Sequence, residues 1–147
     1  CFKHCKTIWN SSWFKCWHGK EKLMTAGEAD LVCDQGATFN VVVTYKNSSG
    51  SAINLTGYGA RMDIRYGQIT DSDILLALGA SNNYVAISNA SNGQITINIP
   101  ANVTDNFNPQ TYYYDLEIYN TNVSPTFVDR VIMGTFEVTP QVTSSAS

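Results

Sequence analysis

Two acidic side chains, Asp115 and Glu117, have the spacing in this sequence that is best suited to chemistry. They alternate with apolar residues in "TYYYDLEIYN" (111–120), which places them on one face of a predicted strand, about 7 Å apart by strand rise. Such a pair could do acid–base work or hold a cation. A solvated strand face opposite a tyrosine-rich core explains the pair as well, and we favour that interpretation.

Other catalytic arrangements lack the residues they need. No histidine follows residue 23, and Cys33 is the only thiol after that point. Neither a Ser–His–Asp nor a Cys–His arrangement can therefore be assembled there. Asp71-Ser72-Asp73 resembles a fragment of a calcium loop but lacks the later glycine and glutamate, so we interpret it as a turn. A chain this short shows no evident cleft, and we expect no enzyme activity, catalytic residue, metal or cofactor.

Charge divides the chain at Met24. Residues 1–23 carry five lysines against one acid, a net +4, whereas residues 24–147 carry four basic side chains against eleven acids, a net −7. The acidic part would repel nucleic acid. Its three arginines stand beside acids on predicted strands, so we expect cross-strand charge pairs rather than phosphate binding. No apolar run approaches the ~20 residues of a membrane-spanning helix, so we expect no membrane partner.

Four hypotheses account for residues 1–23. We favour a non-native leader, because Lys20-Glu21 is what a ribosome-binding sequence spells when it is translated, and Met24 follows at a start-codon distance. The alternatives are a docking helix bearing Trp9, Trp13 and Trp17; a zinc site from Cys1, His4, Cys5, Cys16 and His18; and disulfides that include Cys33.

Residues 24–140 have the pattern of one all-β domain. Apolar and polar residues alternate with period two in successive short segments separated by polar turns. In 58–67, for example, Ala60, Met62, Ile64 and Tyr66 share one face. The predicted strands are 37–46, 58–67, 73–78, 84–88, 93–100, 111–120 and 127–138.

Turn residues indicate how these segments connect. "GASNN" predicts a hairpin between 73–78 and 84–88, "ANVTDNF" predicts a single helical turn, and Gly134 predicts a β-bulge. Seven or eight antiparallel strands with one apolar face each favour an immunoglobulin-like β-sandwich, although the usual Cys and Trp markers of that fold are missing. Residues 141–147 lack an apolar pattern and are expected to form a flexible tail.

Five motifs in order resemble a family of small tailed-bacteriophage virion proteins, similar to the N-terminal β-sandwich of lactococcal phage upper baseplate proteins. They are "QGATF", "LTGY" with "ARMDIR", "NGQITINIP", "TYYYDLEIYN" and "DRVIMGTFEVTPQVT", and the resemblance covers about residues 30–143. Residues 1–23 have no counterpart in it.

The resemblance implies a structural protein in the virion, a module that docks on the tail, baseplate, neck or capsid and fastens fibres, without catalytic residues. Its partners would be other phage structural proteins, with several copies in each particle. Tyrosine buries a large rigid surface at small entropic cost, so we expect Tyr113 and Tyr119, on the outward face of 111–120, at a protein contact. The rival hypothesis is a carbohydrate-binding sandwich that uses aromatic faces among residues 112–114 together with Asp115 and Glu117.

Overall fold

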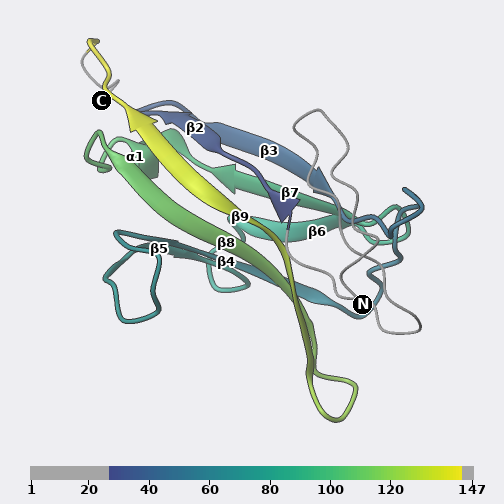
Figure 1. Cartoon of the computed structure of the whole chain (residues 1–147). Helices are drawn as coiled ribbons and strands as arrows, with labels where there is room; N and C mark the ends of the chain where they lie inside the picture. The colour runs from purple at the N-terminus through teal and green to yellow at the C-terminus, as the bar shows by residue number, and fades with distance from the viewer. Residues whose placement is uncertain (1–26, 144–147) are drawn as a thin grey trace, which may run out of the picture.

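A computed structural model describes residues 27–143, which form nine strands and one short helix (Figure 1). The predictions for residues 1–23 and for Met24, and the end of the predicted tail, lie outside the described residues. The elements are β1 (Gly27–Glu28), β2 (Leu31–Asp34), β3 (Phe39–Thr44), β4 (Gly59–Arg65), β5 (Ile74–Leu78), β6 (Val85–Asn89), β7 (Gln94–Ile99), α1 (Ala101–Thr104), β8 (Thr111–Asn120) and β9 (Phe127–Thr139).

The strands form two sheets that pack face to face as a β-sandwich (Figure 1). One sheet has the order β1-β9-β8-β4-β5, with β2 also paired to β9, and the other has the order β3-β7-β6. Strands β9, β8, β4 and β5 lie in one sheet as G, F, C and C′ do in an immunoglobulin-like sandwich, and β3, β7 and β6 lie in the other sheet as B, E and D do. The predicted all-β sandwich is therefore confirmed, although the described residues form nine strands rather than the seven or eight expected.

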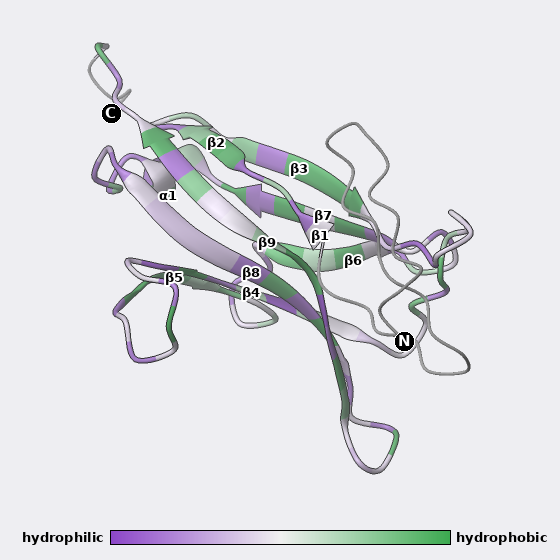
Figure 2. Ribbon diagram, viewed as in Figure 1, coloured by the Kyte–Doolittle hydropathy of each residue, from purple (hydrophilic) through white to green (hydrophobic). Residues whose placement is uncertain are grey.

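Period-two burial builds the core between the sheets. In β8, the buried side chains are Tyr112, Tyr114, Leu116 and Ile118, as the alternation predicts. Strand β7 supplies three isoleucines with no exposed surface, and β4 supplies Met62 and Ile64. Each such side chain stabilises the fold by about 1.5–3 kcal/mol through the apolar area that it removes from water. The hydropathy colouring in Figure 2 shows the alternation along the strands.

Three predictions about connections are wrong. Strands β5 and β6 do not form a hairpin, because β5 pairs with β4 while β6 pairs with β7 in the other sheet. The sandwich is not wholly antiparallel, because β1 and β2 run parallel to β9. The bulge in β9 is not at Gly134, which pairs regularly with Tyr114, but at Val131, which the register skips.

Gly134 has a different role. A Cβ atom there would collide with the carbonyl oxygen of Ala29 and lie 2.9 Å from its carbonyl carbon. The chain between β1 and β2 passes so close to β9 that only glycine fits, and Tyr114 donates a hydrogen bond of 2.7 Å to the same carbonyl oxygen. This packing fixes residues 28–30 against β9.

The predicted helical turn is present as α1, directly after β7. Pro100 ends β7 because it has no N–H to donate to the next ladder position. Thr104 is fully buried, and its hydroxyl donates to the carbonyl oxygens of Ala37 at 2.7 Å and Ala101 at 3.1 Å. The helix thereby closes one end of the core.

Candidate functional site

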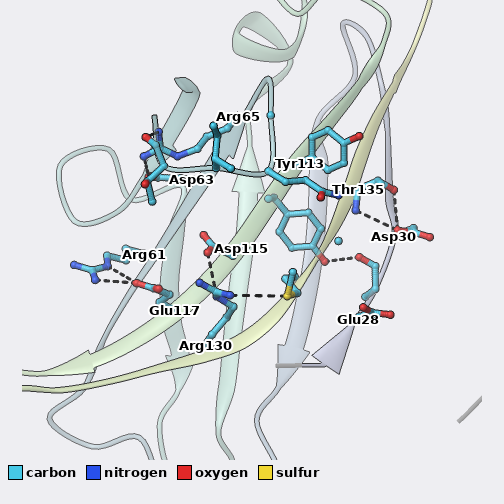
Figure 3. Close-up of a pocket in the computed structure, with 18 residues that line it drawn as sticks. Glu28, Asp30, Arg61, Asp63, Arg65, Tyr113, Asp115, Glu117, Arg130 and Thr135 are labelled. Atoms are coloured by element: carbon cyan, nitrogen blue, oxygen red, sulfur yellow. Dashed lines mark hydrogen bonds and ion pairs between the residues drawn. The ribbon is translucent and has the colours of Figure 1, made fainter. Parts of the chain in front are cut away.

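The outer face of the six-stranded sheet carries a hollow of about 840 Å³ (Figure 3). Its floor comes from β4, β8 and β9, and its walls come from the β1–β2 connection and the β4–β5 loop. The sequence showed no evident cleft, so this feature corrects that expectation. The charged lining side chains are Glu28, Asp30, Arg61, Asp63, Arg65, Asp115, Glu117 and Arg130.

Strand alternation explains why the floor is polar. The apolar residues of β8 point into the core, so Tyr113, Asp115, Glu117 and Tyr119 must point outward. The same parity turns the charged residues of β4 outward. Register then brings the two rows together, with Arg61 opposite Glu117 and Asp63 opposite Asp115.

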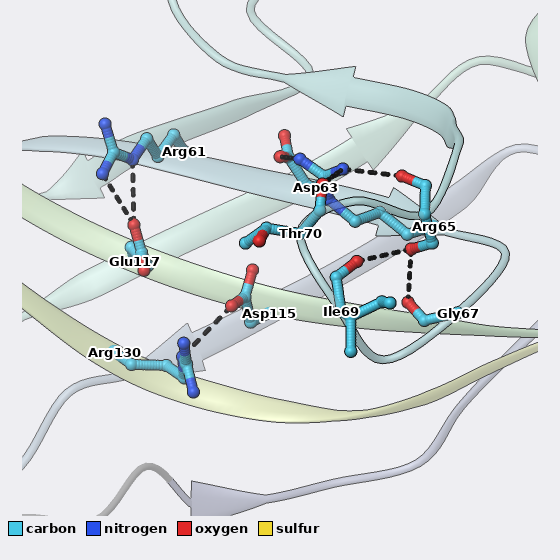
Figure 4. Close-up of polar contacts among 10 residues, drawn as sticks. Arg61, Asp63, Arg65, Gly67, Ile69, Thr70, Asp115, Glu117 and Arg130 are labelled. Atoms are coloured by element: carbon cyan, nitrogen blue, oxygen red, sulfur yellow. Dashed lines mark hydrogen bonds and ion pairs between the residues drawn. The ribbon is translucent and has the colours of Figure 1, made fainter.

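Three ion pairs cover this floor (Figure 4). Arg61 donates to Glu117 through two nitrogens, at 2.8 and 2.9 Å. Arg65 pairs with Asp63 at 2.8 Å, and Arg130 pairs with Asp115 at 3.1 Å. The expected charge pairing of the three arginines is confirmed, although Arg65 pairs along its own strand rather than across strands. Such partly exposed pairs add only about 0–1 kcal/mol each to stability, so their main effect is to fix side-chain positions.

Asp115 stands at the centre of the carboxylates. Burial raises the pKa of Asp115 above its ordinary value, and the neighbouring Glu117 and Asp63 raise it further, while the Arg130 and Arg65 guanidinium groups lower it. Like charges directly opposite each other on neighbouring strands disfavour pairing. The arginines offset this repulsion, so the floor has complementary charges in close contact rather than one isolated reactive group.

The two walls are fixed to the floor by hydrogen bonds. On one side, the Asp30 carboxylate accepts the backbone N–H and the hydroxyl of Thr135, at 3.1 and 2.7 Å, and these bonds hold the pKa of Asp30 below its ordinary value. On the other side, the Arg65 guanidinium donates to the carbonyl oxygens of Thr70 and Ser72, both at 2.9 Å. The walls are therefore built into the fold.

The two tyrosines predicted at a protein contact both lie on this outer face, and both are half-buried. Tyr113 lines the hollow. The ring of Tyr119 lies against Gly59, with the guanidinium carbon of Arg61 5.6 Å from its centroid. Whether they touch a partner stays a prediction.

Three other tyrosines bear on the rival hypothesis and on the predicted core. Tyr112 and Tyr114 are buried in the core, which leaves Tyr113 as the aromatic side chain that residues 112–114 offer to a sugar. Tyr66 was predicted on the inner face with Ile64, but it lies beyond the end of β4 and is 46% exposed. Its ring packs edge-on against Tyr112 with centroids 5.1 Å apart.

Metal and thiol chemistry find little support between residues 27 and 143. No group of three or more His, Cys, Asp or Glu side chains in that range could hold a metal ion. Asp71-Ser72-Asp73 lies in a turn, as predicted. Cys33 is a buried free thiol, and burial raises its pKa to about 11. No helix within that range is long and apolar enough to cross a bilayer.

Sequence reasoning missed the contribution of Glu28, Asp30 and the β4–β5 loop to the hollow. The outward parity of β4 and β8 was readable, but the short β1 and β2 strands have no alternating pattern of useful length. Comparison with protein-family models finds no match to this chain, and comparison with curated proteins finds no significant relative.

Proposed function

We propose that this chain is a structural protein of a bacteriophage virion and that it works by docking on other virion proteins, in several copies, through the outer face of its six-stranded sheet. The order of the five motifs across residues 30–143 and the sandwich fold support the proposal. It requires no cofactor, nucleic acid or membrane.

The observation that carries the proposal is the kind of residue on this face. Tyrosine, arginine and methionine are among the residues that are enriched in protein interfaces. The hollow is lined by Tyr113, Met133 and three arginines, and carboxylates of the same lining pair with those arginines. Tyr119, which lies outside the hollow, extends the same composition through the contact of its ring with the Arg61 guanidinium.

The charge arrangement suits recognition better than turnover. Each arginine of the floor is already oriented by a carboxylate, so little side-chain entropy is lost when a partner packs on it. Complementary charges on a partner would increase the specificity and the association rate of binding more than its affinity.

A particle-incorporation assay tests the function. Tyr113→Ala and Tyr119→Ala should lower the amount of the chain in purified phage particles, as measured by immunoblot against a major capsid protein. Val42→Ser changes an exposed side chain on the outer face of the other sheet and should leave incorporation unchanged. If the wild-type chain is missing from particles made by the phage that encodes it, the proposal is wrong.

A second candidate function is carbohydrate binding, and the hollow is the observation that favours it. Tyr113 beside Asp115 and Glu117 could stack on a sugar ring and accept hydrogen bonds from its hydroxyls. A glycan array with the full chain separates the two functions. Specific sugar binding that is lost in Asp115→Asn and Glu117→Gln, while incorporation into particles stays normal, would favour this alternative.

A further inference from the structure

The carboxylates on the floor of the hollow each pair through one oxygen (Figure 4). Both donating nitrogens of Arg61 reach Oε2 of Glu117, and the other two floor pairs use Oδ2 of the aspartate. The second oxygen of each carboxylate has no hydrogen-bond or ion-pair partner among residues 27–143. An ionised carboxylate can accept about four hydrogen bonds, so the floor can accept more donors than the protein supplies.

The guanidinium groups of the floor, in contrast, direct their donors at the protein itself. Arg65 donates to Asp63 and to two carbonyl oxygens of the β4–β5 loop. One nitrogen of Arg130 contacts Asp115, and another lies 3.9 Å from the sulfur of Met133. The hollow therefore offers an occupant acceptors more readily than donors.

The lining of the hollow is negatively charged. Five carboxylates against three guanidinium groups leave a net charge of −2 (Figure 3). Glu28, on one wall, forms no ion pair with any residue from 27 to 143. Burial raises the pKa of Asp115, and the neighbouring charges of Glu117 and Asp63 raise it further. A cation placed beside Asp115 would reduce this repulsion.

Apolar and aromatic side chains stand around these acceptors. Ile69, in the β4–β5 loop, is 66% exposed, Met133 of β9 is 38% exposed, and Tyr113 of β8 is half-buried; all three line the hollow. An occupant therefore meets apolar contacts as well as carboxylate oxygens. Arginine and lysine side chains have the matching combination of an apolar stem and a cationic head.

We propose that the hollow receives a basic segment of a neighbouring virion protein, in which an arginine guanidinium group binds the free oxygens of Asp115 and Glu117 while its stem lies against Ile69 and Met133. This inference rests on the proposed function, because it names the chemistry of the partner that docks on this face. The hollow, about 840 Å³, is larger than one side chain, so residues beside the arginine would lie in it too.

Arginine fits this floor better than lysine does. Its N–H donors point outward in one plane, whereas the lysine ammonium is a compact point charge. One guanidinium group can therefore reach two carboxylates at alternate positions of a strand, about 7 Å apart by strand rise. It also stacks on aromatic rings, and Tyr113 lies in the same lining.

An acidic segment fits the hollow poorly. It would add negative charge to a lining that already has an excess of carboxylates, and like charges brought together at an interface disfavour binding. A metal ion is no better supported, since no group of three or more possible ligands occurs among residues 27–143.

A peptide titration of the full chain, followed by amide NMR, tests the proposal. The probe is acetyl-Gly-Leu-Arg-Leu-Gly-amide. The matched control peptide has citrulline in place of arginine, which keeps the shape and removes the charge. The arginine peptide should shift the amide signals of residues that line the hollow, and the citrulline peptide should bind at least about fivefold more weakly. A third peptide, with glutamate at that position, should not bind.

Variants of the chain locate the contact. Asp115→Asn removes a negative charge and leaves Arg130 unpaired, so it should weaken binding of the arginine peptide at least about fivefold and change binding of the citrulline peptide little. Glu137→Gln removes the same charge from β9 outside the lining, and it should change the affinity by less than about twofold. Ile69→Ser should weaken binding of both peptides, because it removes apolar contact. Circular dichroism confirms that each variant is folded.

Several results would overturn the proposal. Equal binding of the arginine and citrulline peptides would show that charge is not recognised, and tighter binding of the glutamate peptide would show that the arginines recruit an anion. Shifts confined to another surface, normal binding by a folded Asp115→Asn chain, or no binding at millimolar peptide would overturn it as well.

This outcome is distinguishable from a failure of the proposed function. A chain that binds the arginine peptide in the hollow but is missing from phage particles would keep this ligand preference and lose the virion role. A chain found in particles whose hollow does not bind the arginine peptide would keep the role and lose the basic partner.

Discussion

Replacing Gly134 with alanine tests how the β1–β2 connection packs on β9. The new methyl group would collide with the carbonyl oxygen of Ala29, which is backbone and cannot rotate away. Overpacking of this kind costs about 1–3 kcal/mol. Displacement of Ala29 would also break its hydrogen bond from Tyr114, worth about 1 kcal/mol. We therefore expect Gly134→Ala to lower the free energy of unfolding by about 2–4 kcal/mol.

Thermal unfolding of the full chain measures this effect. A loss of that size should lower Tm by roughly 6–16 °C for a domain of this length. Gly79→Ala is the matched control, because a Cβ atom at Gly79 has no neighbour within 4 Å, and it should change stability by less than about 1 kcal/mol. Equal melting temperatures for the two variants would refute the packing of Ala29 on β9, and with it the wall that residues 28–30 give the hollow.

Three further predictions concern single polar groups. Asp30→Asn should lower stability at neutral pH. The hydrogen bonds from Thr135 hold the folded-state pKa of Asp30 below its ordinary 3.8, so its stabilisation is present above that pH and is lost as pH falls through the lowered pKa. Denaturant unfolding at a series of pH values should show the two chains converging in acid, and a constant difference would contradict the reasoning. Burial raises the pKa of the Cys33 thiol to about 11. Cys33 should therefore resist alkylation at mildly alkaline pH until the chain is denatured, as measured by peptide mass spectrometry. Rapid labelling of the folded chain would show that Cys33 is not buried. Tyr45→Phe removes the hydroxyl that donates to the Asp129 carboxylate and should cost about 1–3 kcal/mol in urea unfolding, whereas an unchanged midpoint would mean that this bond adds nothing.

Local sequence patterns predicted which side chains of each strand are buried, because successive side chains of a strand point to opposite faces of the sheet. The segment 111–120 was predicted as a strand, and β8 spans Thr111–Asn120. Tyr112 and Leu116 face the core and Tyr113 faces outward, as the alternation requires. These assignments depend on one strand at a time, and sequence is informative at that level.

The pairing of strands could not be predicted in the same way. The residues between β5 and β6 have hairpin chemistry, yet the chain crosses there from one sheet to the other. Turn residues determine where the chain reverses but not which strand the next segment will join. Gly134 illustrates the same limit. A glycine is needed there because Ala29, which belongs to a segment about a hundred residues earlier, approaches its backbone closely.

The candidate site was predicted only in part. Asp115, Glu117 and Tyr113 were placed on one outward face, and the arginines were expected to pair with acids. Their gathering in one hollow depends on the register between β4, β8 and β9 and on the loop after β4, which are tertiary features.

A density map of the intact particle that contains this chain would test the docking of the outer sheet face most directly. We expect a neighbouring virion protein to cover the side chains of Tyr113 and Tyr119, with the outer face of β3-β7-β6 left open to solvent. A map in which the chain is present and the hollow with its two tyrosines faces solvent, while another surface makes the contacts, would contradict the account.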